Sequence, residues 1–494
     1  MQTKEIDLRN FSYDSALLSL FPADFAYDRC VLPLWREGET LYVAMPKEAD
    51  LELQDELAFL SGCQIKPVVV DEGQLKAAVE ECYVDRLLSE ATASPVQVLS
   101  EETVEDVDLA QVAQEAKTVR YVNLLFHQAV GEGASDIHLE PFEKEYIVRF
   151  RIDGVLHRAS SPPPGMHAAI ASRIKIMAGL DIAQRRLPQD GRIRLRIAGR
   201  QIDVRVSTIP TLYGESIVMR LLDGAAVPLN LEELGMDSYT LNTYRKLIKK
   251  PYGVILVTGP TGSGKTTTLY AALREVFTEE KKIITIEDPV EYQLSGVNQI
   301  PVQPQIGLTF ARGLRSILRQ DPDIVMVGEV RDPETAQISI QAALTGHLVF
   351  STLHTNNAAG GITRLLEMGV EPYLVASTVE GIIAQRLVRL ICPECREPYE
   401  DPVLAEKLGC PDPTFWRGRG CANCHYSGYR GRTGIFELLP VDEQIRELTL
   451  KQASTEELQA AARKAGMKLL AESGWEKVKK GLTTAQEVER VAGS

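Results

Sequence analysis

The sequence predicts a multidomain α/β protein. Its 494 residues exceed what one hydrophobic core accommodates, and an apolar content of 44% is enough to fold about three domains. From about residue 241, apolar runs of strand length alternate with helical stretches, the pattern of a mostly parallel sheet covered by helices. A polar, acidic segment at 90–108 has the composition of a linker. We therefore expect a small first domain, a second α/β domain and a larger third one.

The first domain is predicted to be a small α/β domain over residues 1–85. Apolar runs at 31–35 and 41–45 flank a glycine turn, as in a β-hairpin. Leucines at helical spacing follow from residue 53, and a strand-like run of three valines stands at 68–70. A further helix is expected to extend to about residue 83.

The second domain, predicted over 117–228 after the linker at 86–116, is mixed α/β and rich in arginine. Residues 146–150 and 202–206 have strand patterns, and residues 167–178 have a helical one. Its arginines outnumber what a solvated surface needs beside a nucleotide domain, so some could contact phosphate. Any one arginine more often forms an ordinary salt bridge with an acidic residue.

The most specific motif is a glycine-rich loop at 259–266, between a buried-strand run at 254–257 and a helix-forming stretch at 267–274. Its glycines let backbone N–H groups converge on phosphate oxygens. Lys265 can reach the β and γ phosphates, and the Thr266 hydroxyl can ligate Mg²⁺. A flexible glycine turn is the alternative, but the complete eight-residue pattern favours binding of ATP with Mg²⁺. The predicted nucleotide-binding residues are Gly259, Pro260, Thr261, Gly262, Ser263, Gly264, Lys265, Thr266 and Thr267.

Three further apolar runs of the third domain end beside acids or histidines. The run at 283–286 precedes Glu287, the run at 324–327 precedes Glu329 after one glycine, and His347 and His354 flank the run at 348–352. In open α/β sheets the ligand lies beyond the carboxyl ends of the strands, so these groups are expected to face the phosphates.

Hydrolysis needs a carboxylate that orients the attacking water and groups that hold the Mg²⁺ shell. Glu329 is our candidate for the water. Because Gly328 stands where an aspartate is usual, magnesium must depend on Thr266, with Glu287 or Asp288 in the outer shell or assisting directly. Each acid could instead form a structural salt bridge, and each histidine could be a packing residue rather than a sensor of the γ-phosphate.

Four of the eight cysteines form two C-x-x-C pairs, Cys392 with Cys395 and Cys421 with Cys424, separated by 25 residues. Two such knuckles can place four thiolates around Zn²⁺, which supplies folding energy to a loop-rich module. Disulfides are the alternative. They are disfavoured because no signal-like segment is present near the amino terminus, which implies a reducing compartment.

Charge and hydropathy exclude several classes of function. A net charge of −14 repels nucleic-acid phosphate unless a basic face is segregated, so no direct nucleic-acid partner is expected. No stretch approaches the roughly 20 apolar residues of a spanning helix. The sequence therefore predicts a cytoplasmic protein.

Several segments together resemble a known family. The segments TGPTGSGKTT, TIEDPVEY, RQDPDIVMVGEVRD and LTGHLVFSTLHTN, with the C-x-x-C knuckles before GYRGRTGI, are similar to the secretion ATPases of the type II/type IV secretion superfamily, and most similar to its type II secretion branch. The resemblance runs from about residue 117 to the carboxyl terminus. It implies a RecA-like P-loop ATPase domain at 238–390 preceded by a PAS-like domain, a zinc-binding tetracysteine module at 391–434 and a helical subdomain at 435–494.

The same resemblance implies a function and partners. It implies a cytoplasmic homo-hexamer that hydrolyses ATP to drive pseudopilus assembly and protein export by type II secretion, with type IV pilus assembly as the alternative. The first domain would dock to the cytoplasmic domain of an inner-membrane platform protein, so membrane contact would be peripheral. The residues implied to act on the nucleotide are Lys265, Glu287 in an Asp box at 287–291, the Walker B residue Glu329, His347 and His354 of a His box, and Arg205 and Arg220 of the preceding domain.

Two other classes stay open from the residues alone. One is a nucleic-acid motor, for which Arg417, Arg419, Arg430 and Arg432 around the knuckles could form a local basic patch. The other is a nucleotide-gated scaffold that scarcely hydrolyses ATP, which Glu329 disfavours. A helical row of Arg312, Arg315 and Arg319 could face a neighbouring subunit or solvent.

Overall fold

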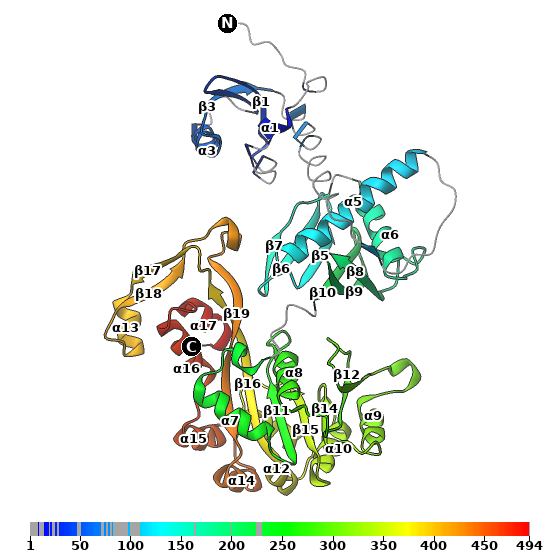
Figure 1. The fold of residues 1–494 in the computed structure, drawn as a ribbon, viewed down its shortest axis with the longest axis vertical. Helices are drawn as coiled ribbons and strands as arrows, with labels where there is room; N and C mark the ends of the chain where they lie inside the picture. The colour runs from blue at the N-terminus through cyan, green and yellow to red at the C-terminus, as the bar shows by residue number, and fades with distance from the viewer. Residues whose placement is uncertain are drawn as a thin grey trace. The chain divides into compact units, whose positions relative to one another are not determined.

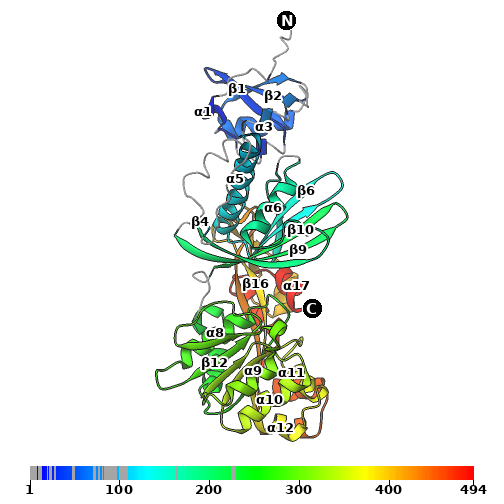
Figure 2. The ribbon, with the colours of Figure 1, turned by 90° about the vertical axis from the view of Figure 1, so that its right-hand side faces the viewer.

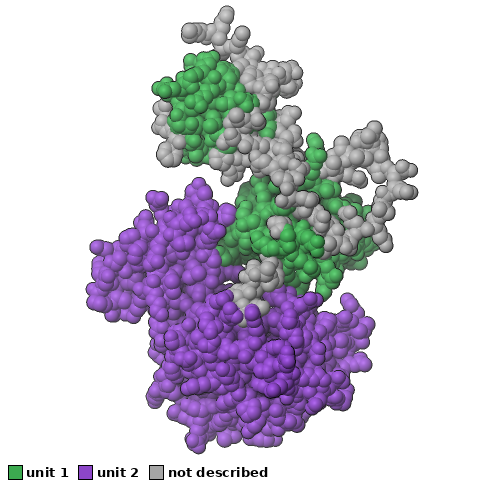
Figure 3. All heavy atoms as spheres, in the orientation of Figure 1, with its two compact units in different colours: residues 1–223 green, residues 224–494 purple. Residues whose placement is uncertain are grey.

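The chain was analysed as a computed structural model, which forms two compact units, 1–223 and 224–494 (Figures 1 and 3). The structure describes residues 8, 14–18, 20–21, 25–26, 29–46, 51–70, 74–75, 78–79, 82, 97–98, 109–162, 165–197, 199–223 and 230–493. Most of the predicted linker and of the helix predicted to end near residue 83 lie outside these residues.

The amino-terminal part of the first unit contains a three-stranded sheet. β1 (Leu32–Glu37) pairs antiparallel with β2 (Thr40–Met45), and β2 pairs parallel with β3 (Gln64–Val69). The crossover between β2 and β3 contains α3 (Leu51–Ser61), and a short α1 (Ser15–Leu18) precedes the sheet. The predicted hairpin, helix and third strand are therefore confirmed.

The rest of the first unit is a seven-stranded antiparallel sheet of order β4-β8-β9-β10-β5-β6-β7. Figure 2 shows α5 (Leu109–Gly131) and α6 (His167–Met177) on one face of this sheet, where they share a single core with its apolar side chains. The strands are β4 (Gln97–Val98), β5 (Asp136–Pro141), β6 (Tyr146–Ile152), β7 (Val155–Arg158), β8 (Gln189–Ile197), β9 (Arg200–Thr211) and β10 (Gly214–Asp223). The two predicted strands and the predicted helix of this region are confirmed.

Alternation in β9 explains this one-sided packing. Ile202, Val204 and Val206 are buried, whereas Asp203 and Arg205 between them point to the other face. α5 begins at Leu109, inside the segment predicted as a linker.

The second unit contains the predicted mostly parallel sheet, which has seven strands in the order β13-β12-β14-β15-β11-β16-β19. Only β16 with β19 is antiparallel among its pairs in the part of the chain that the structure describes. The strands are β11 (Gly253–Thr258), β12 (Ile283–Glu287), β13 (Val297–Pro301), β14 (Ile324–Val327), β15 (Leu348–Leu353), β16 (Val379–Ile391) and β19 (Tyr429–Pro440).

Helices cover both faces of this sheet, each with its own core. α7 (Ser238–Ile248) and α8 (Lys265–Val276) pack on one face. The opposite face carries α9 (Phe310–Ile317), α10 (Pro333–Leu344), α11 (Ala359–Glu367) and α12 (Pro372–Thr378). β11 shows why both faces are covered, because Val254 and Leu256 belong to one core and Ile255 and Val257 to the other.

The carboxyl-terminal part adds a small hairpin and five α-helices among the described residues. They are β17 (Arg396–Glu400), α13 (Pro402–Leu408), β18 (Thr414–Gly418), α14 (Glu443–Leu450), α15 (Thr455–Lys464), α16 (Leu470–Lys479) and α17 (Ala485–Ala492). Among the described helices of the whole chain, none has both the length and the apolar character that crossing a membrane requires.

Candidate active site

The parallel strands of the second unit bring distant loops to one edge of the sheet. Thr258 at the end of β11 aligns with Leu353 near the end of β15, and Val327 at the end of β14 aligns with Ser351. The loops that follow these strands carry the P-loop, His354 and Glu329. They therefore leave the sheet side by side, at the edge where open α/β sheets bind ligands.

The P-loop has the backbone that its glycines predict. Gly259, Gly262 and Gly264 have φ values of 152°, 77° and 87°, which favour glycine. A Cβ on Gly259 would lie 2.6 Å from both the Gln385 carbonyl oxygen and the Ser263 Oγ. The loop therefore packs closely against β16 and leads directly into α8.

The loop fits a phosphate group on physical grounds. The N-terminus of α8 directs backbone N–H groups at the loop, and the buried Ser263 Oγ lacks a hydrogen-bond partner among the described residues. Lys265 Nζ folds back and donates to the carbonyl oxygens of Gly259 at 2.8 Å and Pro260 at 3.1 Å. Burial lowers the pKa of Lys265, which an incoming phosphate would reverse.

Glu329 follows β14 at this edge and faces the P-loop lysine. Its side chain is 13% exposed, forms an ion pair with Arg331 and lies beside His354, whose Nε2 is 3.5 Å from a carboxylate oxygen. The Glu329 charge also opposes the lowering of the Lys265 pKa by burial. The structure thus brings together Lys265, Glu329 and His354.

Glu287 occupies a different environment from the one expected of it. It is 3% exposed, and its carboxylate accepts hydrogen bonds from the Tyr270 hydroxyl, from Thr285 Oγ1 at 2.5 Å and from Gln299 Nε2 at 3.1 Å. Burial raises the pKa of this carboxyl. Its acceptor sites are therefore used inside the protein. The exposed Asp288 is the neighbour whose charge reaches Arg331, where it helps to raise the pKa of that arginine.

His347 lies at the opposite edge of the sheet from the P-loop. It precedes β15, whose first residue, Leu348, aligns with Gly253 at the start of β11. Six strand residues separate the two histidines, a span of roughly 20 Å at ~3.3 Å per residue. The His347 Nδ1 lies 2.8 Å from the carbonyl oxygen of Ala342 in the last turn of α10. Within one chain, the structure does not bring His347 together with His354, because the strand between them holds them apart.

Comparison with known proteins decides the family. A model described as "Type II/IV secretion system protein" matches residues 111–490, and one described as "MshEN domain" matches residues 1–88. The chain belongs to the type II/IV secretion ATPase family. It is therefore an enzyme that hydrolyses ATP.

Relatives from two branches of the family are similar to the whole chain or to most of it. The type II secretion system ATPase E of Vibrio cholerae is 51% identical over 397 residues, covering 80% of this chain and 79% of that protein. The type II secretion system protein E of Aeromonas hydrophila is 46% identical over 487 residues, covering 96% and 97%. The type IV pilus assembly ATPase PilB of Myxococcus xanthus is 45% identical over 496 residues, covering 98% and 88%.

Solved structures show the same fold. The pilus retraction motor PilT with bound ADP is 28% identical, with a TM-score of 0.53, over 74% of this chain and 95% of that one. The ATPase DotB of Legionella pneumophila, at 22% identity and a TM-score of 0.57, covers 80% and 98% and shows the fold alone.

The ATPase carries two predicted arginines in its first unit. Arg205 in β9 stands directly opposite Arg220 in β10. The Arg220 Nε donates to Asp136 Oδ1 at 3.1 Å, while half of the Arg220 side chain stays exposed. The two guanidinium-bearing residues are thus adjacent on the sheet face that the helices leave open.

Three other predicted arginines lie on or just after α9. Arg312, Arg315 and Arg319 are all exposed, with Arg315 paired to Glu334 at 2.5 Å. They do not belong to the group around Glu329.

Sequence reasoning missed two residues of β16 that support the P-loop of the ATPase. Gln385 Oε1 accepts a hydrogen bond from Thr268 Oγ1 of α8 at 2.6 Å, in a fully buried contact. Arg386 donates to the carbonyl oxygens of Gln385 and Asn356, each at 3.0 Å, and its charge further lowers the Lys265 pKa. Neither residue has a local motif, because β16 stands beside β11 only in the folded sheet.

The four predicted zinc ligands also converge, in the hairpin region of the second unit. The Sγ atoms of Cys392 and Cys421 lie 3.9 Å apart, those of Cys395 and Cys424 3.8 Å, and those of Cys421 and Cys424 3.7 Å. Four sulfurs at ~2.3 Å from a central Zn²⁺ would form a tetrahedron with edges of about 3.8 Å. The cluster therefore fits Zn²⁺ and contains no disulfide.

Backbone donors favour the thiolate of Cys424 in this cluster, whereas burial raises the pKa of Cys395 and of Cys421. The N–H groups of Gly420 and Cys421 point at the Sγ atoms of Cys395 and Cys424, at 3.3 and 3.2 Å. Burial raises the pKa of Cys424, but hydrogen bonds from the backbone more than offset it, so the pKa falls to about 7. N–H groups of this kind stabilise the negative sulfur that a metal requires.

Proposed function

We propose that this ATPase is the motor of a type II secretion system, in which ATP hydrolysis drives pseudopilus assembly and protein export. The observation that carries the hydrolytic part is the position of Glu329, which follows β14 at the P-loop edge of the sheet and whose charge opposes the lowering of the Lys265 pKa by burial. The pathway is supported by identities of 51% to the type II secretion system ATPase E of Vibrio cholerae and 46% to the protein E of Aeromonas hydrophila.

We assign the chemical roles as follows. Backbone N–H groups of the P-loop and Lys265 hold the phosphates, and Thr266 ligates Mg²⁺. Glu329 orients the attacking water, and His354, 3.5 Å from it, reports the presence of the γ-phosphate. Asp288 serves the magnesium shell from outside, while the buried Glu287 positions Asp288 through its hydrogen bonds to Tyr270 and Gln299. His347 has no assigned contact with the nucleotide of its own chain.

The first unit contributes arginines and requires assembly. We assign Arg205 and Arg220 to the nucleotide phosphates, as the family resemblance implies, within a homo-hexamer. A site completed by arginines of another domain is active only when the domains close in the right pairing. Turnover per subunit should therefore rise with protein concentration as rings assemble. A rate per subunit that stays constant from dilute monomer to concentrated oligomer contradicts this assembly requirement.

The amino-terminal domain recruits the motor to its partner. The match to the MshEN domain over residues 1–88 marks a separate module before the motor, and we assign it to the cytoplasmic domain of an inner-membrane platform protein. In this proposal the protein is cytoplasmic and touches the membrane only through that partner.

A pull-down of the full chain from a membrane extract, with mass spectrometry of the retained proteins, tests the pathway. Retention of a type II secretion platform protein by the full chain, and its loss when residues 1–85 are deleted, is the expected result. Retention of nucleic-acid-associated proteins instead would contradict it.

Type IV pilus assembly is the second candidate, because PilB of Myxococcus xanthus is 45% identical over 98% of this chain. Similarity alone does not separate it from type II secretion, since the protein E of Aeromonas hydrophila is 46% identical over 96% of this chain. The same pull-down distinguishes the two candidates, because a pilus platform component in place of a secretion one selects pilus assembly.

We assign Zn²⁺ to the tetracysteine cluster. The four ligand atoms lie within 4.8 Å of one another, and Cys392, Cys395 and Cys424 are buried. All-sulfur tetrahedral sites of this kind hold structural zinc rather than catalytic zinc, because no position stays open for a substrate. The metal would stabilise the fold and would take no part in ATP hydrolysis.

A further inference from the structure

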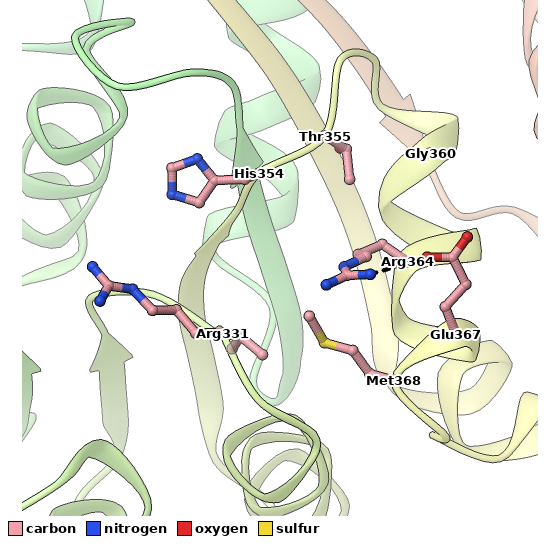
Figure 4. A pocket seen from close by; sticks show the side chains of 8 residues that line it. Arg331, His354, Thr355, Gly360, Arg364, Glu367 and Met368 are labelled. Carbon is pink, nitrogen blue, oxygen red and sulfur yellow. Dashed lines mark hydrogen bonds and ion pairs between the residues drawn. The ribbon is translucent and has the colours of Figure 1, made fainter.

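A polar pocket of about 410 Å³ opens in the second unit between the loops that carry Arg331 and His354 and the helix that carries Arg364 (Figure 4). Arg331 and His354, which both lie beside Glu329, line one side of it from the loops after β14 and β15. Arg364 and Met368 line the other side, from α11 and the residue that follows it. The proposed function assigns nothing to Arg364 or to this space.

The pocket and the P-loop lie toward opposite faces of the same sheet edge. The P-loop continues into α8, which packs on one face, whereas α11 packs on the other. Glu329 and His354 follow β14 and β15, the strands that lie between these helices. A group that leaves the γ-phosphate side of the P-loop would therefore meet this pocket on the far side of Glu329.

The cations of the pocket suit a phosphate. Arginine presents a planar fork of donors that matches phosphate oxygens. Arg331 pairs with Glu329, and Arg364 pairs with Glu367 at 3.1 Å, with arginine side chains that are 63% and 45% exposed. Both partners of the Arg364–Glu367 pair are exposed, so a phosphate could exchange for the Glu367 carboxylate at low cost, whereas Glu329 is only 13% exposed.

We infer that this pocket receives the inorganic phosphate released by hydrolysis, and that Arg364 is its main anchor. The inference rests on the proposed role of Glu329. When the phosphate takes Arg331 as a partner, Glu329 is freed from that ion pair for the next water. Phosphate in the pocket is thus a step between cleavage and release, and Arg364 sets how long it stays.

The test is calorimetric titration of inorganic phosphate into the full chain saturated with Mg²⁺ and ADP. We expect Arg364→Gln to weaken phosphate binding by about tenfold, because a charged hydrogen-bonding partner is lost. Arg364→Lys, which keeps the charge and loses the fork, should fall between. The affinity for ADP should not change in either variant. The matched control is Arg463→Gln, which removes an exposed arginine paired with Glu472 at 2.6 Å outside the pocket.

The outcomes separate this inference from the proposed function. Phosphate affinity that is equal in the wild type and in Arg364→Gln overturns the pocket assignment, even if ATP is hydrolysed normally. An oligomeric state that changes in Arg364→Gln with phosphate affinity intact overturns it too, in favour of a contact between subunits. If the Glu329→Gln variant hydrolyses ATP as fast as the wild type, the proposed function itself is contradicted.

Discussion

The second unit contains two candidate ligand sites that are built in opposite ways. The P-loop edge stands on a seven-stranded sheet with an extensive core on each face. The tetracysteine cluster stands on a two-stranded hairpin, and its own buried cluster consists of Cys392, Cys395 and Cys424 with Cys421 packed against them. One site is held by the fold, and the other has few apolar contacts besides its own ligands.

This difference predicts which ligand the fold needs. The P-loop glycines are supported by β16 and α8 whether or not a phosphate is bound, since those contacts are internal to the protein. The hairpin beside the cysteines packs Phe415 against Leu404 and Val488, whereas the four cysteines form a cluster of their own, so we expect metal binding to stabilise the loops that carry them. Nucleotide removal should leave the fold intact, and zinc removal should not.

The largest expected effect is therefore that of Cys395→Ser. Losing one of four thiolates should abolish zinc binding and unfold residues 391–424 locally, because structural zinc contributes on the order of 10 kcal/mol to small domains at neutral pH. Metal content by atomic spectroscopy and proteolysis at these residues measure the change. Cys410→Ser, at a cysteine outside the cluster, is the control. Unchanged zinc content in Cys395→Ser would show that the cluster is not a metal site.

Glu329→Gln should reduce hydrolysis by about 10²–10⁴-fold, the usual contribution of a group that handles the proton of the attacking water. The amide keeps the size of the side chain and most of its packing. ATP affinity, followed with a fluorescent analogue, and thermal stability should therefore stay close to those of the wild type. A variant that still turns over ATP at the wild-type rate removes Glu329 from the proposed mechanism.

The same contrast explains what could be predicted from the sequence. The P-loop, its flanking strand and helix, and the C-x-x-C pairs are local patterns, so the residues that make them could be named in advance. Glu287 could not be placed, because its buried partners Tyr270 and Gln299 come from a helix and a strand on either side of it in the sequence.

Other parts of the site depend on the order of the strands. A histidine on either side of one apolar run looks equivalent in a sequence, but the ends of a strand lie at opposite edges of the sheet, which separates His347 from His354. Arg364 and Gln385 come close to the nucleotide edge only because α11 and β16 pack beside strands that lie far from them in the chain. Long-range packing of this kind leaves no local pattern.

Besides the metal, a buried ion pair stabilises the region around the cysteine module by joining β16 to α17. Glu487 of α17 is 1% exposed and binds Arg389 of β16 at 2.8 Å. Burial raises the pKa of Glu487, but its hydrogen bonds with Arg490 and Arg389 outweigh this and lower the pKa to about 2. Because the unfolded value is 4.5, the pair stabilises the fold fully above pH 4.5, by roughly 3 kcal/mol. This contribution is lost as the pH falls toward 2.

Glu487→Gln should therefore lower the unfolding midpoint at pH 7, and the gap from the wild type should narrow between pH 4.5 and pH 3. Thermal unfolding followed by circular dichroism at these pH values measures it. Glu489 lies on the same helix and pairs with Lys407 at 3.2 Å, with both side chains exposed. Glu489→Gln should therefore change the midpoint little at any pH. A gap for Glu487→Gln that is the same at pH 7 and pH 3 would contradict the lowered pKa.

The smallest expected effect concerns the buried hydrogen bond between Thr268 of α8 and Gln385 of β16, next to the P-loop. Thr268→Val should cost about 1–2 kcal/mol of stability, because it leaves the buried Gln385 Oε1 without its donor. Adding Gln385→Leu removes the stranded acceptor, so the double variant should be less destabilised than the sum of the two single ones. Denaturant unfolding with and without MgATP tests whether this support exists before the nucleotide binds. If the two substitutions are non-additive only when MgATP is present, the Thr268–Gln385 contact forms only with the nucleotide. The P-loop would then depend on its ligand for its structure, as we expect of the cysteine cluster.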